Sequence, residues 1–175
     1  MRLKDKVKVL NEQYGNIIHK ANEVVKSNYC KGLTKDQLKA WGIVDVVYLP
    51  IVDEWQVHRY WYKNNGRVKV NSVILPTKAI GKHKYRPDKE YYKITFSVRG
   101  EGSYSIPLSR LIYVWFNGDI PDGYVVDHID NDSYNNAPIN LRILTVADNL
   151  AKRYTDNPES WTNQWGKPKG YEKLK

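Results

Sequence analysis

The sequence predicts an α+β fold on three features: an apolar stripe of helical period near the N-terminus, alternating apolar and polar residues in the middle, and a strand, loop, strand and helix pattern towards the C-terminus. The 175 residues, 41% of them hydrophobic, suffice for one compact domain or one domain with a small appendage. A single cysteine excludes a disulfide framework and any zinc site that needs two thiolates. We expect a cytoplasmic location, because lysines interrupt the N-terminal stretch where a signal peptide needs apolar residues.

Residues 1–42 are predicted to form a helical N-terminal appendage. The apolar residues of 4–27 recur at steps of three and four, which indicates one amphipathic helix. Thr34 followed by Gln37 is a capping-box pattern, so a second, short helix should follow and stop at Gly42.

Residues 43–106 are expected to form an antiparallel β region. Runs rich in β-branched and aromatic residues indicate strands, and Asn65-Gly66 favours a hairpin turn because both residues tolerate a positive φ. The expected strands are 46–49, 55–63, 67–70, 93–98 and 104–106.

Charge is distributed unevenly along the chain, whose net charge is +9. Residues 55–110 carry twelve bases and three acids, whereas 111–150 carry one base and six acids. A basic region beside an acidic one is typical of a polyanion-binding protein with a cation site, although a merely basic surface is the alternative. Stretch 76–90 has the composition of a basic loop that contacts phosphates or is simply solvated. Its candidate phosphate contacts are Lys78, Lys82, Lys84, Arg86 and Lys89.

A helix is predicted to begin at Pro107, whose missing N–H costs nothing in a first helical turn. The residues of its expected apolar face are Leu108, Leu111, Ile112 and Trp115. Asn117-Gly118 should end it.

A strand, a polar loop, a second strand and a helix are predicted next. The strands are expected at 124–129 and 141–144, and the helix should begin where Thr145 and Asp148 form a capping pair. Residues 155–175 show no periodicity and are expected to form a basic tail that is either an extended arm or partly disordered.

Four residues at these junctions have the chemistry of metal-assisted phosphodiester cleavage. A neutral imidazole such as His128 can take a proton from water. Asp127 and Asn149 carry the oxygen donors that a hard divalent cation prefers. A side-chain amide such as Asn140 could fix the imidazole ring. Each residue alone is more typical of a solvated surface, so the combination supports the hypothesis.

This combination resembles the HNH nuclease superfamily, in particular the phage homing-endonuclease type whose motif ends in Asn. The signature letters are His128, Asn140 and Asn149, separated by 12 and 9 residues. The flanking matches are Arg110-Leu111, Phe116-Asn117-Gly118, Ile120-Pro121-Asp122-Gly123, Val126 to Asp130, Asn135-Asn136, Leu141-Arg142 and Thr145. One departure is Ser109, where many relatives have His.

The resemblance implies a ββα-metal nuclease core at 107–154. His128 would be the general base, and Asn140 would orient it. Asp127 and Asn149 would hold one Mg2+ or Mn2+ ion, and no structural zinc is expected in a chain with one cysteine. The further residues expected to contact DNA are Arg110, Arg142, Lys152 and Arg153.

The sequence therefore predicts a divalent-metal-dependent endonuclease that acts on double-stranded DNA and has no membrane partner. It would nick one strand or cut both, as a monomer or a homodimer. The expected role is that of a phage homing endonuclease or nickase. The alternative is a non-catalytic, basic DNA-binding protein on the same scaffold, such as a phage packaging accessory.

Overall fold

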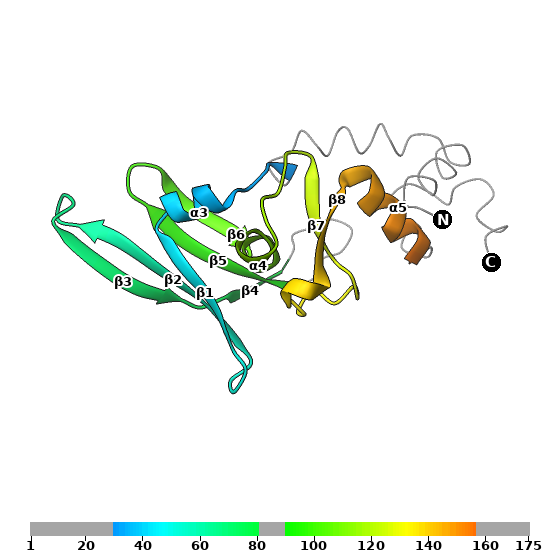
Figure 1. Cartoon of the computed structure of the whole chain (residues 1–175), viewed down its shortest axis with the longest axis horizontal. Helices are drawn as coiled ribbons and strands as arrows, with labels where there is room; N and C mark the ends of the chain where they lie inside the picture. The colour runs from blue at the N-terminus through cyan, green and yellow to red at the C-terminus, as the bar shows by residue number, and fades with distance from the viewer. Residues whose placement is uncertain (1–29, 81–89, 157–175) are drawn as a thin grey trace. The chain divides into compact units, whose positions relative to one another are not determined.

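The computed structural model describes residues 30–80 and 90–156 (Figure 1). The helix predicted over 4–27, the loop residues Lys82, Lys84, Arg86 and Lys89, and the tail beyond residue 156 lie outside these described residues. No helix within the described ranges is long and apolar enough to cross a membrane.

The described chain divides into two compact units. One comprises Leu33–Ile120 and His128–Arg142, and the other includes residues 30–32, 121–127 and 143–156. Helices and antiparallel strands are mixed along the chain, so the predicted α+β class is confirmed. The four-part division of the chain at residues 42, 106 and 154 stays a prediction.

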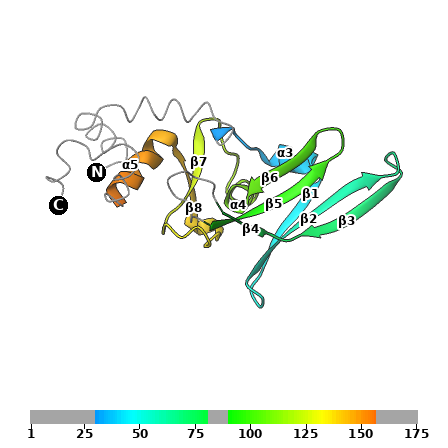
Figure 2. The same ribbon diagram turned by 180° about the vertical axis from the view of Figure 1, so that it is seen from behind.

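The unit of Leu33–Ile120 and His128–Arg142 contains two three-stranded antiparallel sheets (Figures 1 and 2). The strands of the first sheet, in spatial order, are β1 (Ile43–Leu49), β2 (Glu54–Lys63) and β3 (Val68–Ile74). Those of the second are β4 (Thr77–Ile80), β5 (Glu90–Val98) and β6 (Gly102–Pro107).

Helix α4 (Leu108–Phe116) lies against β5 and β6 and forms the core of this unit. Its buried residues are Leu108, Leu111, Ile112 and Val114. They pack against the side of β5 that carries the buried residues Ile94 and Phe96. These two share one side because alternate residues of a strand face the same way. The predicted face is corrected at one position, since Val114 is buried and Trp115 is only half-buried, with the Lys35 ammonium 4.7 Å from its ring centre.

The short helix α3 (Lys35–Ala40) begins as its capping box predicts. The Thr34 hydroxyl accepts a hydrogen bond from the backbone N–H of Gln37 at 3.1 Å. The Gln37 side chain accepts one from the N–H of Thr34 at 2.8 Å. Gly42 follows with a φ of +87°, and a Cβ at this position would lie 2.1 Å from the Tyr60 carbonyl oxygen.

The predicted hairpin of β2 and β3 is present, but its turn is longer than Asn65-Gly66. Asn64, Asn65 and Gly66 all have positive φ, and the N–H of Arg67 donates to the Asn64 carbonyl at 3.2 Å. Strand β3 then runs to Ile74, four residues beyond the predicted end.

The predicted basic loop 76–90 is wrong at its start, because Thr77–Ile80 forms β4. This strand is at the edge of its sheet and pairs with β5, with Lys78 opposite Tyr92. An edge strand tolerates an exposed lysine, which also discourages pairing with another chain, so charge did not exclude a strand here.

Several element boundaries differ slightly from the prediction, for example at β5, which begins at Glu90, three residues earlier than expected. Strand β1 begins at Ile43, three residues earlier than expected. Pro107 is the residue before α4 and the last residue of β6, because its φ of −54° and ψ of 133° still fit an edge strand. Strand β7 (Tyr124–His128) ends one residue before Ile129.

The remaining elements carry the predicted site residues. Strand β7 pairs with β8 (Leu141–Thr145) in a two-stranded sheet, and a 3-10 turn, η2 (Pro138–Asn140), precedes β8. Helix α5 (Val146–Asp156) follows at once. Within the unit that contains α5, Cys30, Val125 and Val146 form a small buried cluster.

Candidate active site

A strand, a loop, a strand and a helix present the predicted residues in the expected order. Asp127 and His128 are the last two residues of β7, Asn140 ends η2, and Asn149 lies in the first half of α5. The start of α5 is capped as the sequence predicts. The Thr145 hydroxyl accepts from the Asp148 N–H at 3.1 Å and donates to its carboxylate at 2.8 Å.

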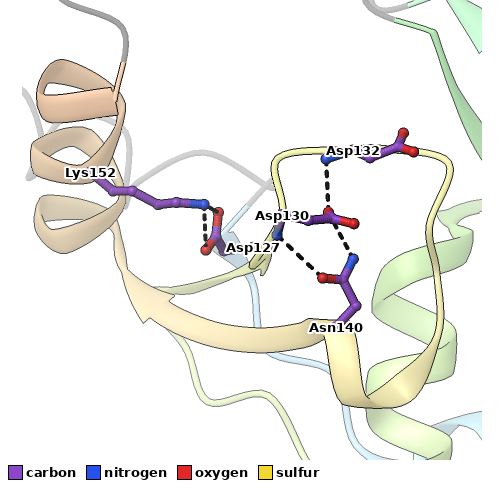
Figure 3. A network of polar contacts seen from close by, with 5 residues as sticks. All are labelled: Asp127, Asp130, Asp132, Asn140 and Lys152. Atoms are coloured by element: carbon purple, nitrogen blue, oxygen red, sulfur yellow. Dashed lines mark hydrogen bonds and ion pairs between the residues drawn. The ribbon is translucent and has the colours of Figure 1, made fainter.

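The Asp127 carboxylate forms a buried ion pair with Lys152 of α5 (Figure 3). The Lys152 Nζ lies 2.8 Å from Oδ1 and 3.0 Å from Oδ2 of Asp127. The exposed fractions of the two side chains are 10% for Asp127 and 9% for Lys152. The Lys152 ammonium thus faces this carboxylate, and the phosphate contact expected of Lys152 stays a prediction.

Asn149 precedes Lys152 by three residues on α5 and shares its helix face. The side chain of Asn149 is half-buried. Lys152 is therefore next to both predicted cation ligands. Asp127 is its partner in the ion pair, and Asn149 is its neighbour on the helix face.

Asn140 holds the loop after β7 (Figure 3). Its amide donates to the Asp130 carboxylate at 2.9 Å and to the Asn135 carbonyl at 2.8 Å, and its Oδ1 accepts from the Asp130 N–H at 3.2 Å. Asn140 was expected to orient the His128 ring directly. Its side-chain amide instead holds Asp130. Its backbone carbonyl accepts a hydrogen bond from the N–H of Ile129, the residue after His128, at 2.9 Å.

Asp130 is the acceptor at the centre of this loop. Besides Asn140, the backbone N–H of Asp132 donates to it at 2.9 Å and the Asn135 amide donates at 2.7 Å. Hydrogen bonds to the ionised form favour ionisation, so the Asn140 amide first, then Asp132 and Asn135, lower the pKa of Asp130 to about 2.

The imidazole of His128 contacts Asn136. Its Nε2 lies 3.1 Å from the Oδ1 of Asn136, a residue that is only 3% exposed. Asn136 was among the matched residues but received no predicted role. A buried amide eight positions away leaves no local pattern that would indicate the contact.

The same loop is fixed to the first residue of β5. The Ser133 hydroxyl donates to the Glu90 carbonyl at 2.9 Å, and the Tyr134 hydroxyl donates to the Glu90 carboxylate. The hydrogen bond to this carboxylate raises the pKa of Tyr134 to about 12. Glu90 carried no sequence signal as a site residue, because it lies 44 positions from Tyr134.

The remaining predicted DNA contacts occupy different elements. Arg110 lies on α4 and Arg142 on β8, both half-buried. Arg153 lies on α5, and its side chain is outside the described residues.

Among residues 30–80 and 90–156, no three His, Cys, Asp or Glu side chains gather as a metal cluster. One carboxylate and one amide nevertheless suit a cation that completes its shell with water and phosphate oxygens. The Asp127 carboxylate already faces a cation, the Lys152 ammonium, so its surroundings suit positive charge.

Comparisons with known proteins identify the segment that contains these residues. A search of curated proteins and a search of solved structures each returned no match. Residues 107–151, however, match the family model described as HNH endonuclease. This segment covers Asp127, His128, Asn140 and Asn149, so the part of the chain that holds the predicted site is similar to HNH endonucleases.

Proposed function

We propose that this protein is a divalent-metal-dependent endonuclease that hydrolyses phosphodiester bonds of double-stranded DNA. The observation that carries the proposal is the pair Asp127-His128 at the end of β7, within the segment that matches HNH endonucleases. A carboxylate and an imidazole provide cation binding and proton transfer, the two requirements of this reaction.

His128 is proposed as the general base. It takes a proton from a water molecule, whose oxygen then bonds to phosphorus as the bond from phosphorus to the 3′ oxygen breaks. Asn140 holds the loop that follows His128, and Asn136 holds the His128 ring. Asn140 does so through Asp130, and Asn136 through its contact with His128.

Asp127 and Asn149 are proposed to hold one Mg2+ or Mn2+ ion. When bound, the ion supplies positive charge for the phosphate and the leaving oxygen. The ion pair of Asp127 with Lys152 supports the assignment, because this carboxylate is positioned and largely shielded from solvent next to a positive charge. Lys152 would have to release the Asp127 carboxylate for Asp127 to serve as a ligand.

DNA binding is assigned to the basic region 55–110, which includes Arg110, and to Arg142 and Arg153. The excess of nine positive charges in 55–110 supports this, since phosphate attraction provides most affinity that is independent of base sequence. We assign 43–106 to DNA contact and 107–154 to the nuclease core. Cytoplasmic action as a phage homing endonuclease or nickase is the proposed setting.

The test is a plasmid-nicking assay with Mg2+ and with EDTA. Relaxation of supercoiled plasmid with Mg2+ and none with EDTA is expected. His128→Ala should lower the cleavage rate by about 10²–10⁴-fold and retain DNA binding, because a general base is worth that factor. His19→Ala makes the same change outside the matched segment and serves as the control.

The second candidate function is a non-catalytic DNA-binding protein on the HNH scaffold. The chain's net charge of +9 favours this candidate. The basic region 55–110 would bind DNA equally well in a nuclease and in a non-catalytic protein. Equal DNA binding with Mg2+ and EDTA, and no cleavage under either condition, would support it and refute the nuclease. A near-normal cleavage rate for His128→Ala would remove His128 from the mechanism.

A further inference from the structure

The contact between His128 and Asn136 defines which imidazole nitrogen carries the proton. We propose that Asn136 is the positioning residue of His128 and holds its neutral ring as the Nε2–H tautomer, so that Nδ1 is the nitrogen that accepts the proton from water. This inference rests on the proposed nuclease function for its catalytic meaning. The geometry itself does not depend on that function.

The orientation of the Asn136 amide follows from its second partner. The amide Nδ2 donates to the Tyr134 carbonyl at 3.2 Å. A carbonyl oxygen can only accept, so the group facing Tyr134 must be the NH2 and the group facing His128 must be Oδ1. Turning the amide over would place two acceptor oxygens together in a residue that is 3% exposed, and water could not readily relieve the contact.

The orientation of the Asn136 amide determines the tautomer of the His128 ring. The Asn136 Oδ1, 3.1 Å from Nε2, accepts only, so Nε2 must donate its hydrogen. A neutral imidazole carries one N–H, which leaves the lone pair on Nδ1. A ring fixed through Nε2 points Nδ1 in a fixed direction, as a general base requires.

The loop that carries Asn136 is itself held in place. The N–H of Asn136 donates to the Tyr134 carbonyl at 3.0 Å, which closes a tight turn between these residues. Tyr134 is tied to Glu90 of β5 through its hydroxyl. The Asn136 side chain that faces His128 therefore belongs to the short segment 134–136, which is closed by the Asn136 N–H and anchored to β5 through Tyr134.

The decisive measurement is a 15N NMR spectrum of the whole protein labelled at histidine nitrogens. It is recorded without metal, at a pH where the rings are neutral, and His128 is assigned by its loss in His128→Ala. We expect Nε2 to resonate as a protonated nitrogen and Nδ1 as an unprotonated one. A mixture of tautomers is expected in Asn136→Leu, which removes the acceptor of the Nε2–H.

Kinetics provide the second readout. Asn136→Leu should lower kcat for plasmid nicking by about tenfold to a hundredfold, the usual effect of losing a group that orients a site residue, with little change in KM. Asn71→Leu, the same substitution on β3, is the control for the spectrum and should leave the His128 resonances unchanged.

The outcomes separate this inference from the proposed function. An Nδ1–H tautomer in the wild-type protein, or an unchanged spectrum in Asn136→Leu, would overturn the positioning role whether or not DNA is cut. The expected spectra together with no cleavage by the wild-type protein would refute the nuclease and leave the contact in place. Because the wild-type spectrum alone tests the tautomer, a variant that fails to fold does not weaken the test.

Discussion

Replacing Lys152 by Met should destabilise the protein by about 3 kcal/mol, because it leaves the Asp127 carboxylate buried without its cation. The Nζ lies 2.8 and 3.0 Å from the two carboxylate oxygens, and both side chains are only about a tenth exposed. Loss of one member of a buried pair costs about 3–5 kcal/mol, and the remaining exposure favours the low end. For a chain of this size, that corresponds to a Tm lower by roughly 6–12 °C.

Urea unfolding of four proteins measures the coupling: wild type, Lys152→Met, Asp127→Asn and the double variant. The double variant should lose less free energy of unfolding than the sum of the single losses, by about 1–3 kcal/mol, because the two groups interact directly. Lys39→Met, on the exposed face of α3, is the matched control and should change stability by no more than about 0.5 kcal/mol.

Magnesium provides a further discriminating measurement on the same variants. If Asp127 holds a cation, Mg2+ at about a hundred times its Kd should return about 2.7 kcal/mol to Lys152→Met and nothing to the double variant. Strictly additive single losses, or a Lys152→Met variant as stable as Lys39→Met, would refute the reasoning about the ion pair.

Two further predictions concern the backbone and the loop. Gly42→Ala should cost at least about 2 kcal/mol in urea unfolding, since its φ is +87° and its Cβ would lie 2.1 Å from the Tyr60 carbonyl. Gly66→Ala has the same φ with open space around it and should cost only about 1 kcal/mol, so equal losses would contradict the clash. Asn140→Ala should raise the pKa of Asp130 from about 2 towards 3.8 in a carboxyl NMR titration, and an unchanged midpoint would count against Asn140 as its main partner. Because the folded-state pKa lies below the ordinary value, the stability that Asp130 contributes is present above pH 3.8 and is lost as the pH falls towards 2.

Periodic patterns predicted most of the described fold. The alternation at 93–98 located β5 and the side of it that is buried, because a strand has a side-chain period of two. Strand β4 was missed, since four residues with an exposed lysine have no such alternation and only pairing with β5 defines them. The longer turn after Lys63 was missed because Asn64 also adopts a positive φ, a conformation that asparagine tolerates but does not require.

The site was predictable in its residues but less so in its contacts. The order and spacing of Asp127, His128, Asn140 and Asn149 indicated the family segment, which the comparison confirmed. The partner of Asp127 lies 25 positions away and became evident only from distances in the folded chain. Pairing of side chains that are distant in sequence depends on tertiary geometry, which periodicity does not report.

The loop between β7 and β8 is held mainly by partners close in sequence. Asp130 and Asn140 are ten positions apart, and His128 and Asn136 are eight. Closing a loop of this length takes about 10–100 ns, so these contacts can re-form locally after a fluctuation without reassembly of the two larger sheets. Substitutions in those sheets should thus leave the loop contacts intact, except at Glu90, whose carbonyl and carboxylate anchor the loop.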